Sequence, residues 1–178
     1  ATQSLYFQQS TYINKKTSLG TGMRLQRNSI AIGDHLDTSA PDYAGWQKKH
    51  TTLLDEEFNY ALNIGIDRSI FNNSEVYSRI GNGFRYPNID DRIGGSGDTS
   101  LELDTQTSQD LEIGYRFNSD TFSTNLSAYI IEAKNELAYD SDAFENININ
   151  STRRFGIEFN TKNNISKKMS LNNDFTFA

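Results

Sequence analysis

The chain has 178 residues, of which 35% are hydrophobic and 22% charged, and its formal net charge is −6. This acidic balance argues against a nucleic-acid-binding protein, which needs a basic stripe. No apolar run approaches the roughly 20 residues that a membrane-spanning helix requires. The absence of cysteine excludes a disulfide framework and a cysteine-based metal site within this chain.

Eight stretches of alternating apolar and polar residues follow one another along the chain. Successive side chains of a strand point to opposite faces, so each stretch predicts a strand with one apolar and one polar face. In chain order the predicted strands cover about residues 4–13, 17–28, 53–70, 75–83, 107–117, 121–137, 151–161 and 169–178. The predicted fold class is therefore all-β.

The connections between these strands are alternately short and long. Tight links are predicted near residues 14–16, 72–73, 118–120 and 163–168, and long polar loops at about 29–51, 84–104 and 138–150. In an antiparallel meander of about eight strands, all short turns then lie at one end and all long loops at the other, as in a transmembrane β-barrel. Aromatic residues flank the short turns, where an interfacial girdle is expected: Tyr12, Phe71, Phe117 and Phe122.

A soluble β-sandwich is the alternative for the fold, because its strands show the same alternation. It predicts that the apolar face of the sixth predicted strand, which includes Leu126 and Ile130, packs on a second layer of this chain. The barrel predicts that this face meets lipid.

Charged residues alternate onto the predicted polar face, which would line the lumen of a barrel. They are Arg24, Glu112, Arg116, Arg154 and Glu158. We expect them to pair with one another or with a plug inside the barrel. Glycines recur on the same face, at positions 20, 22, 65, 114 and 156. Since a strand glycine marks a close approach or a bend, two interpretations stay open, a plug pressed against the wall or barrel curvature.

The chain offers little for catalysis. We find no nucleophile–base pair, phosphate loop or metal triad. The only two histidines lie in one loop, which gives little support for acid–base catalysis. Asp140 and Asp142 lack the spacing of a full calcium loop, so they predict a solvated turn. We therefore predict a protein that is not an enzyme and that carries no metal or other cofactor.

Four motifs in the middle of the chain carry a resemblance to a known family. They are Tyr77–Arg79 followed by Gly83–Asn88, Leu103–Ser108 followed by Glu112–Tyr115, Ile130–Glu136, and Asn148–Glu158. In order and spacing they resemble the barrel strands of TonB-dependent outer-membrane receptors. Thr105–Gln106 stands where that family usually has Pro-Glu.

The resemblance implies that residues 1–178 are part of the 22-stranded, plugged barrel of a Gram-negative outer membrane. The N-terminal plug and the segment that contacts the TonB complex would lie outside this chain. The implied function is energised import of a scarce nutrient, a ferric siderophore or another metal chelate. A passive outer-membrane porin or structural barrel is the alternative.

We predict that an extracellular small-molecule ligand contacts the external loops. The candidate residues are His35, Tyr43, Trp46, His50 and Arg85. Four of them lie in the first long loop, which holds the only Trp and both histidines of the chain. Concave binding sites use a few such aromatic and polar groups to fix a ligand. The alternative is a solvated loop with Trp46 folded onto its neighbours.

Overall fold

The protein is described here by a computed structural model that covers residues 1–33, 52–92 and 103–178. These residues form one antiparallel sheet of eight strands, whose order in space is their order in the chain. The strands are β1 (Thr2–Asn14), β2 (Thr17–Gly33), β3 (Thr52–Phe71), β4 (Ser74–Arg85), β5 (Gln106–Asn118), β6 (Phe122–Asp140), β7 (Glu145–Ser166) and β8 (Met169–Phe177). A short helix, α1 (Ile89–Arg92), lies between β4 and β5.

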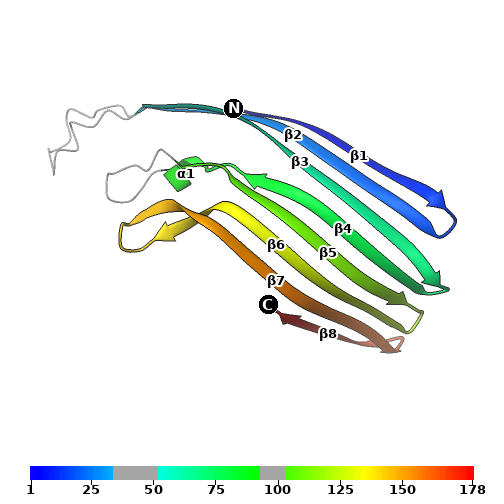
Figure 1. Ribbon diagram of the computed structural model, residues 1–178. Coiled ribbons are helices and arrows are strands. Elements are labelled where there is room, and N and C mark those ends of the chain that lie inside the picture. The colour runs from blue at the N-terminus through cyan, green and yellow to red at the C-terminus, as the bar shows by residue number, and fades with distance from the viewer. Residues whose placement is uncertain (34–51, 93–102) are drawn as a thin grey trace.

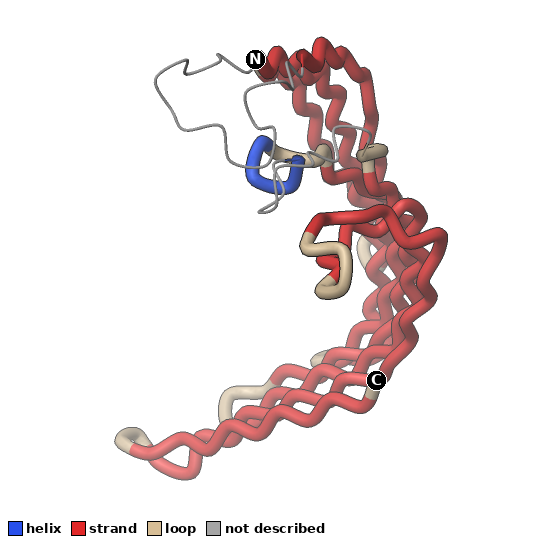
Figure 2. Tube along the Cα trace, turned by 90° about the vertical axis from the view of Figure 1, so that its left-hand side faces the viewer, coloured by secondary structure: helices blue, strands red, loops and turns tan. Residues whose placement is uncertain are grey.

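The sheet is open and curved, as expected for eight strands that form part of a larger barrel. β1 and β8 form its two edges. Figure 1 shows the links β1–β2, β3–β4, β5–β6 and β7–β8 together at one end, which we call the turn end. The other end is the connection end. Seen from the side, the sheet bends into an open arc with α1 on its concave side (Figure 2).

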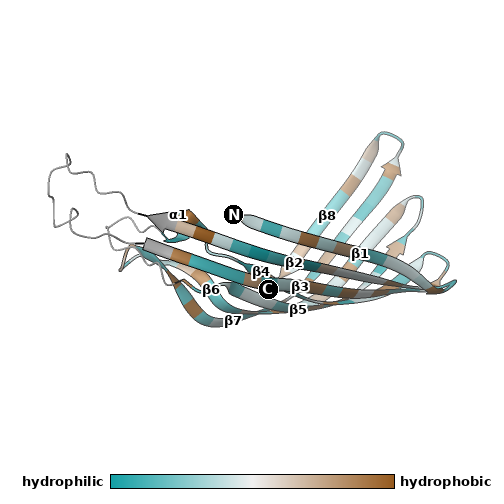
Figure 3. Ribbon diagram, turned by 90° about the horizontal axis from the view of Figure 1, so that it is seen from above, coloured by the Kyte–Doolittle hydropathy of each residue, from teal (hydrophilic) through white to brown (hydrophobic). Residues whose placement is uncertain are grey.

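The alternation seen in the sequence gives the sheet two different faces, and Figure 3 shows it as brown and teal segments along the strands. Paired residues of antiparallel neighbours point to the same side, so the register aligns the apolar side chains into rows across the sheet. One such row crosses β3 to β7 toward the connection end, and we call it the upper apolar row: Ile64, Ile80, Leu111, Ile130 and Phe155. The middle row includes Ile66, Ile113, Ala128, Ile157 and Phe177.

No second layer covers this outer face in the part of the chain that the structure describes. Ile113 is 55% exposed and Phe155 is 65% exposed, although such side chains are usually buried in soluble proteins. The sandwich interpretation required Leu126 and Ile130 to pack on another layer, and both are more than a third exposed. That interpretation is wrong, because the described strands form a single sheet whose apolar face stays exposed.

The prediction of a third long loop at residues 138–150 is wrong. β6 continues to Asp140 and β7 begins at Glu145, so the link is a four-residue turn. The predicted long loop between β4 and β5 is present, shifted slightly because β4 continues to Arg85, and it contains α1. Within the described ranges, no helix has the length and apolarity needed to cross a membrane.

The β3–β4 ladder ends before either strand does. The last pair toward the connection end is Asn63 with Gly81, whereas β3 continues to Thr52 in register with β2. At the separation, the Asn82 amide nitrogen donates to the Tyr60 carbonyl at 2.9 Å, and its Oδ1 accepts from the Leu62 N–H at 2.9 Å. A side chain thus replaces one rung of the backbone ladder.

Candidate functional site

A polar network occupies the inner, concave face near the turn end. At its centre is Tyr77, which is only 5% exposed. Its hydroxyl donates to Glu112 Oε1 at 2.6 Å and lies 3.3 Å from Asn125 Oδ1. The guanidinium carbons of Arg116 and Arg79 lie 3.9 and 4.9 Å from the centroid of the Tyr77 ring, within reach of cation–π attraction.

Carboxylates on β3 and β4 complete this network. Arg116 Nη1 lies 2.8 Å from Glu75 Oε1 and 3.2 Å from Asp67 Oδ1, and Arg79 lies 4.0 Å from the same Asp67 oxygen. The predicted inner-face residues Glu112 and Arg116 are therefore paired with inner-face neighbours. Three adjacent strands contribute charges of both signs, which fits a hydrated wall better than an apolar core.

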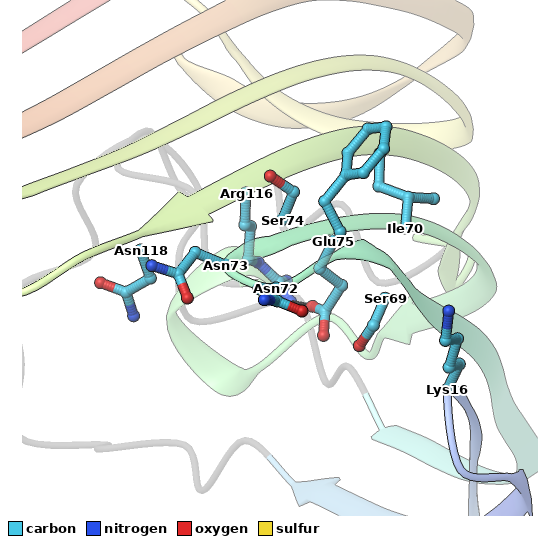
Figure 4. Close-up of a pocket in the computed structure, with 10 residues that line it drawn as sticks. Lys16, Ser69, Ile70, Asn72, Asn73, Ser74, Glu75, Arg116 and Asn118 are labelled. Atoms are coloured by element: carbon cyan, nitrogen blue, oxygen red, sulfur yellow. Dashed lines mark hydrogen bonds and ion pairs between the residues drawn. The ribbon is translucent and has the colours of Figure 1, made fainter.

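A cavity of about 850 Å³ with both polar and apolar lining residues borders the network at the turn end. In Figure 4, Lys16 lies on one side of its lining and Asn118 on the other, with Arg116 and Glu75 between them. The cavity is formed by turn residues and the ends of β3, β4 and β5. Its lining provides hydrogen-bonding groups and one ion pair, but no arrangement of groups for catalysis.

The inner-face glycines have different structural reasons. A Cβ at Gly114 would lie 2.3–2.5 Å from atoms of the Tyr77 side chain, and one at Gly156 would lie 2.6 Å from the Tyr129 hydroxyl oxygen. Tyrosines of neighbouring strands thus lie across these two glycines, a reason that neither sequence interpretation included. At Gly20, by contrast, the nearest atom is the Gly65 carbonyl oxygen at 4.0 Å.

The β4–β5 connection folds over the inner face at the connection end. The Tyr86 hydroxyl donates to the Gln26 carbonyl at 3.0 Å, and Pro87 is almost fully buried. Arg92, 2% exposed, forms an ion pair with Asp55 at 2.9 Å. These contacts attach the connection to β2 and β3.

The same connection is also attached to β7. The Asn146 side-chain amide donates to the Asp91 carbonyl at 3.0 Å. The Asn148 side chain accepts from the Asp104 N–H at 2.7 Å and donates to the Asp104 carbonyl at 3.1 Å. The connection therefore bridges β2–β3 and β7 on the concave side of the sheet. It occupies part of the space that the concave face encloses at the connection end.

Arg24 lies on the inner face of β2, where its neighbours are mainly aromatic. Its guanidinium carbon lies 5.3 Å from the ring centroids of both Tyr6 and Phe84, and it donates to the Gln26 side chain. The contact with Phe84 places the end of β4 on the lumen side of β2.

Arg154 and Glu158 also lie on the inner face. Glu158 is paired in register with Ser127 and Thr176, in the same row as Tyr77. Arg154 donates to Glu136, although strict alternation would put Glu136 on the outer face. The change follows Asn135, whose φ of 51° interrupts the regular strand. Hydrogen bonds from Thr152 and Arg154 hold the pKa of Glu136 below its usual range.

Of the predicted ligand contacts, Arg85 is the one that the structure describes. Its guanidinium binds both oxygens of Asp91, at 2.8 and 3.0 Å, and its side chain remains 48% exposed. Asp91 also accepts from the Asn88 N–H at 2.8 Å, so Arg85 helps to fix α1. His35, Tyr43, Trp46 and His50 lie outside the described residues.

The predicted set of inner-face charges leaves out several residues that lie on this face or are attached to it. They are Asp67, Glu75, Tyr77, Arg79 and Arg92. Tyr77 and Arg79 follow the alternation of β4, whose apolar face is interrupted by Ser78. Extending that alternation through the register of β3 and β5 would have indicated the first four. Arg92 follows no strand pattern.

Comparisons with known proteins agree with this geometry. A family model described as TonB-dependent receptor-like β-barrel matches residues 1–178. Among solved structures, the copper transporter OprC aligns with a TM-score of 0.77 at 13% identity, over 99% of this chain and 28% of that one. The ferric yersiniabactin uptake receptor FyuA from Yersinia pestis gives a TM-score of 0.78 at 13% identity, over 98% of this chain and 26% of that one.

The siderophore receptor PirA from Pseudomonas aeruginosa gives a TM-score of 0.69 at 17% identity, over 99% of this chain and 34% of that one. At such identities the likeness shows the fold alone. This chain spans about a quarter to a third of the length of these structures. Among curated proteins, none matches its sequence.

Proposed function

The chain belongs to the TonB-dependent receptor-like β-barrel family, and from this membership we propose that the intact protein is an outer-membrane receptor that imports a scarce nutrient. We propose a ferric siderophore or another metal chelate as the ligand. The family match over the whole chain is the observation that carries the proposal. The names of the structural neighbours, which include a copper transporter and siderophore receptors, support this class of ligand.

The two faces of the sheet support placement in a membrane as a barrel wall. The outer face presents rows of exposed apolar side chains, and the inner face carries paired charges. In outer-membrane barrels, short turns face the periplasm and longer connections face outside. We therefore place the turn end in the periplasm and the connection end outside a Gram-negative cell.

We propose that residues 1–178 form part of the barrel domain and that the plug and the segment contacting the TonB complex lie elsewhere in the intact protein. The TonB complex would then supply energy for import. The inner-face charges would line the hydrated space around the plug. In this role the protein is a transporter and not an enzyme.

We propose that the connection of residues 34–51 captures the ligand from outside, through His35, Tyr43, Trp46 and His50. Arg85 would contribute from the end of β4, where it binds Asp91 of α1. The start of β7 lies beside this helix, since Asn146 donates to the Asp91 carbonyl. Several polar and aromatic groups would then converge at the external mouth of the barrel, as ligand sites require.

Uptake by energised and de-energised cells tests the proposal. Cells that carry the intact receptor are supplied with a panel of ferric siderophores, with and without a protonophore. We expect one or more of these chelates to accumulate, and accumulation to stop when the protonophore is added. Continued uptake under the protonophore would indicate a passive porin instead.

Loop deletion tests the ligand site separately. β2 ends at Gly33 and β3 begins at Thr52, so replacing residues 35–50 with a short Gly-Ser link leaves both strands intact. We expect weaker ligand binding with normal barrel assembly, because surface loops carry few structural contacts. Replacing residues 141–144, the external β6–β7 turn, is the matched control. Unchanged binding by the first variant would remove this loop from the site.

A further inference from the structure

The outer face of the sheet is hollowed where β4 and β5 bend away from β3. The β3–β4 ladder ends at Asn63 and Gly81, yet β4 and β5 stay paired up to Arg85 and Gln106. By the alternation along β4, Phe84 is expected on the same outer face as Ile80 and Asn82. Its ring nevertheless contacts Arg24 on the inner face of β2. The ends of β4 and β5 therefore pass to the lumen side of β2 and β3.

This displacement leaves a cavity of about 670 Å³, a volume within the usual range of small-molecule sites. Its walls come from β3, which contributes Tyr60 and Leu62, and from β6, which contributes Ile130 and Lys134. The floor consists of residues of β4 and β5.

The lining changes from apolar to polar along the strands. The part of the cavity nearer the turn end is lined by four members of the upper apolar row: Ile64, Ile80, Leu111 and Ile130. One rung nearer the connection end, the outer-face row is Asn82, Gln109, Glu132 and Arg153, and the first three of these also line the cavity. The cavity thus crosses the boundary where the outer face changes from apolar to polar.

The charges on the outer face at this boundary are net positive. Glu132 forms an ion pair with Arg153, while Lys134 has no ion-pair partner among the described residues. Asp110 also lines the cavity, but it is paired in register with Gly81 and Ile131 on the inner face. An anionic group on the outer side would therefore meet Lys134 and the side-chain amide of Gln109, whereas the Asn82 amide is bonded to the β3 backbone.

We propose that this cavity binds a phosphorylated lipid of the outer leaflet. An acyl chain lies along Ile80, Leu111 and Ile130, in continuity with the lipid around the barrel. The phosphate headgroup lies at the level of Asn82, Gln109 and Lys134. A lysine provides a compact positive charge for a phosphate, and the Gln109 amide provides a further donor. The inference depends on the membrane orientation proposed above, but not on which ligand is transported.

Lipid binding to the intact receptor tests the inference. The purified receptor, freed of bound lipid in detergent, is titrated with bisphosphorylated lipid A, and the complexes are counted by native mass spectrometry. Lys134→Gln removes the charge, and Gln109→Trp fills the cavity from an exposed position. Lys167→Gln, in the β7–β8 turn at the opposite end of the sheet, is the matched control.

We expect lipid A to bind about tenfold more weakly to Lys134→Gln, to be excluded by Gln109→Trp, and to bind normally to Lys167→Gln. Dephosphorylated lipid A should bind as weakly to the unmodified receptor as lipid A binds to Lys134→Gln. Equal affinity of all three variants for lipid A would overturn the site. Equal binding of the dephosphorylated lipid would overturn the assigned headgroup, as would full competition by inorganic phosphate. None of these outcomes depends on nutrient uptake.

Discussion

Two adjacent residues of β5, Ile113 and Gly114, lie in opposite surroundings. The Ile113 side chain is 55% exposed on the outer face, in the middle of the apolar rows. Gly114 lies on the inner face beneath Tyr77, which is bonded to Glu112 and flanked by two arginines. The polar side chains around Tyr77 on the inner face pair with one another, whereas the apolar side chains of the outer face are left uncovered by the described part of the chain.

The largest expected effect comes from placing a charge on the outer face. Ile113→Lys lies in the middle row, and a lysine near the bilayer midplane should destabilise the barrel by about 2–4 kcal/mol. Ile130→Lys lies in the upper row, near the polar boundary, so its cost should fall to about 0–1 kcal/mol. Unfolding of the intact receptor in lipid vesicles measures both.

The control for this pair is Gln8→Lys, which puts the same charge on the inner face of β1. Gln8 is paired in register with Gly22 and is exposed, so the change should be nearly neutral. An equal cost at Gln8 and Ile113 would mean that the two faces do not differ in their surroundings.

A smaller effect is expected from adding a methyl group to the inner face. In Gly114→Ala the new Cβ would lie within 2.5 Å of Tyr77 atoms, and overpacking of this kind typically costs about 1–3 kcal/mol. Gly20→Ala is the matched control, because its nearest atom lies 4.0 Å away. The double variant Tyr77→Ala, Gly114→Ala should show no additional cost from the Gly114 change. The same denaturation experiment separates these outcomes.

The smallest effect concerns the external turn between β6 and β7. Phe144 has a φ of 57°, a conformation that Asn adopts far more readily than a bulky side chain. Phe144→Asn should therefore stabilise the receptor by roughly 0.5–1 kcal/mol. Phe144→Ala keeps the unfavourable backbone conformation and should give no gain. Hydrogen exchange of the β6–β7 hairpin measures its local stability as the temperature rises. The midpoint of this transition should rise for Phe144→Asn and stay unchanged for Phe144→Ala.

The sequence was sufficient for the strands where one face is apolar. The predicted range 107–117 agrees with β5 (Gln106–Asn118) within one residue at each end, because alternation is strong where opposite faces have different surroundings. Prediction failed at residues 138–150. There Ile147 and Ile149 alternate with asparagines, but this repeat is short and the residues before it, 140–146, are mostly polar. The β6–β7 ladder nevertheless continues to the pair Asp140–Glu145.

Alternation indicates on which face of a strand a side chain lies, but not which residues it contacts. Arg24, Glu112, Arg116, Arg154 and Glu158 lie on one face of the sheet, and that this face lines a lumen stays a prediction. Their partners depend on which residues the register brings together, as with Arg116 and Asp67, which are 49 residues apart in the chain. The inward fold of the β4–β5 connection follows from tertiary contacts such as Arg92 with Asp55, for which the sequence has no periodic signal.

Spin labelling gives the most direct test of the claim that the outer face meets lipid. Single cysteines are introduced into a cysteine-free intact receptor at Leu19, Thr21 and Ile113 on the outer face, and at Ser18 and Gly20 on the inner face. Each is labelled with a nitroxide in lipid vesicles. The account predicts high accessibility to oxygen and low accessibility to a water-soluble nickel chelate at the first three positions, and the reverse at the other two. Equal access of the nickel chelate to both sets would contradict it.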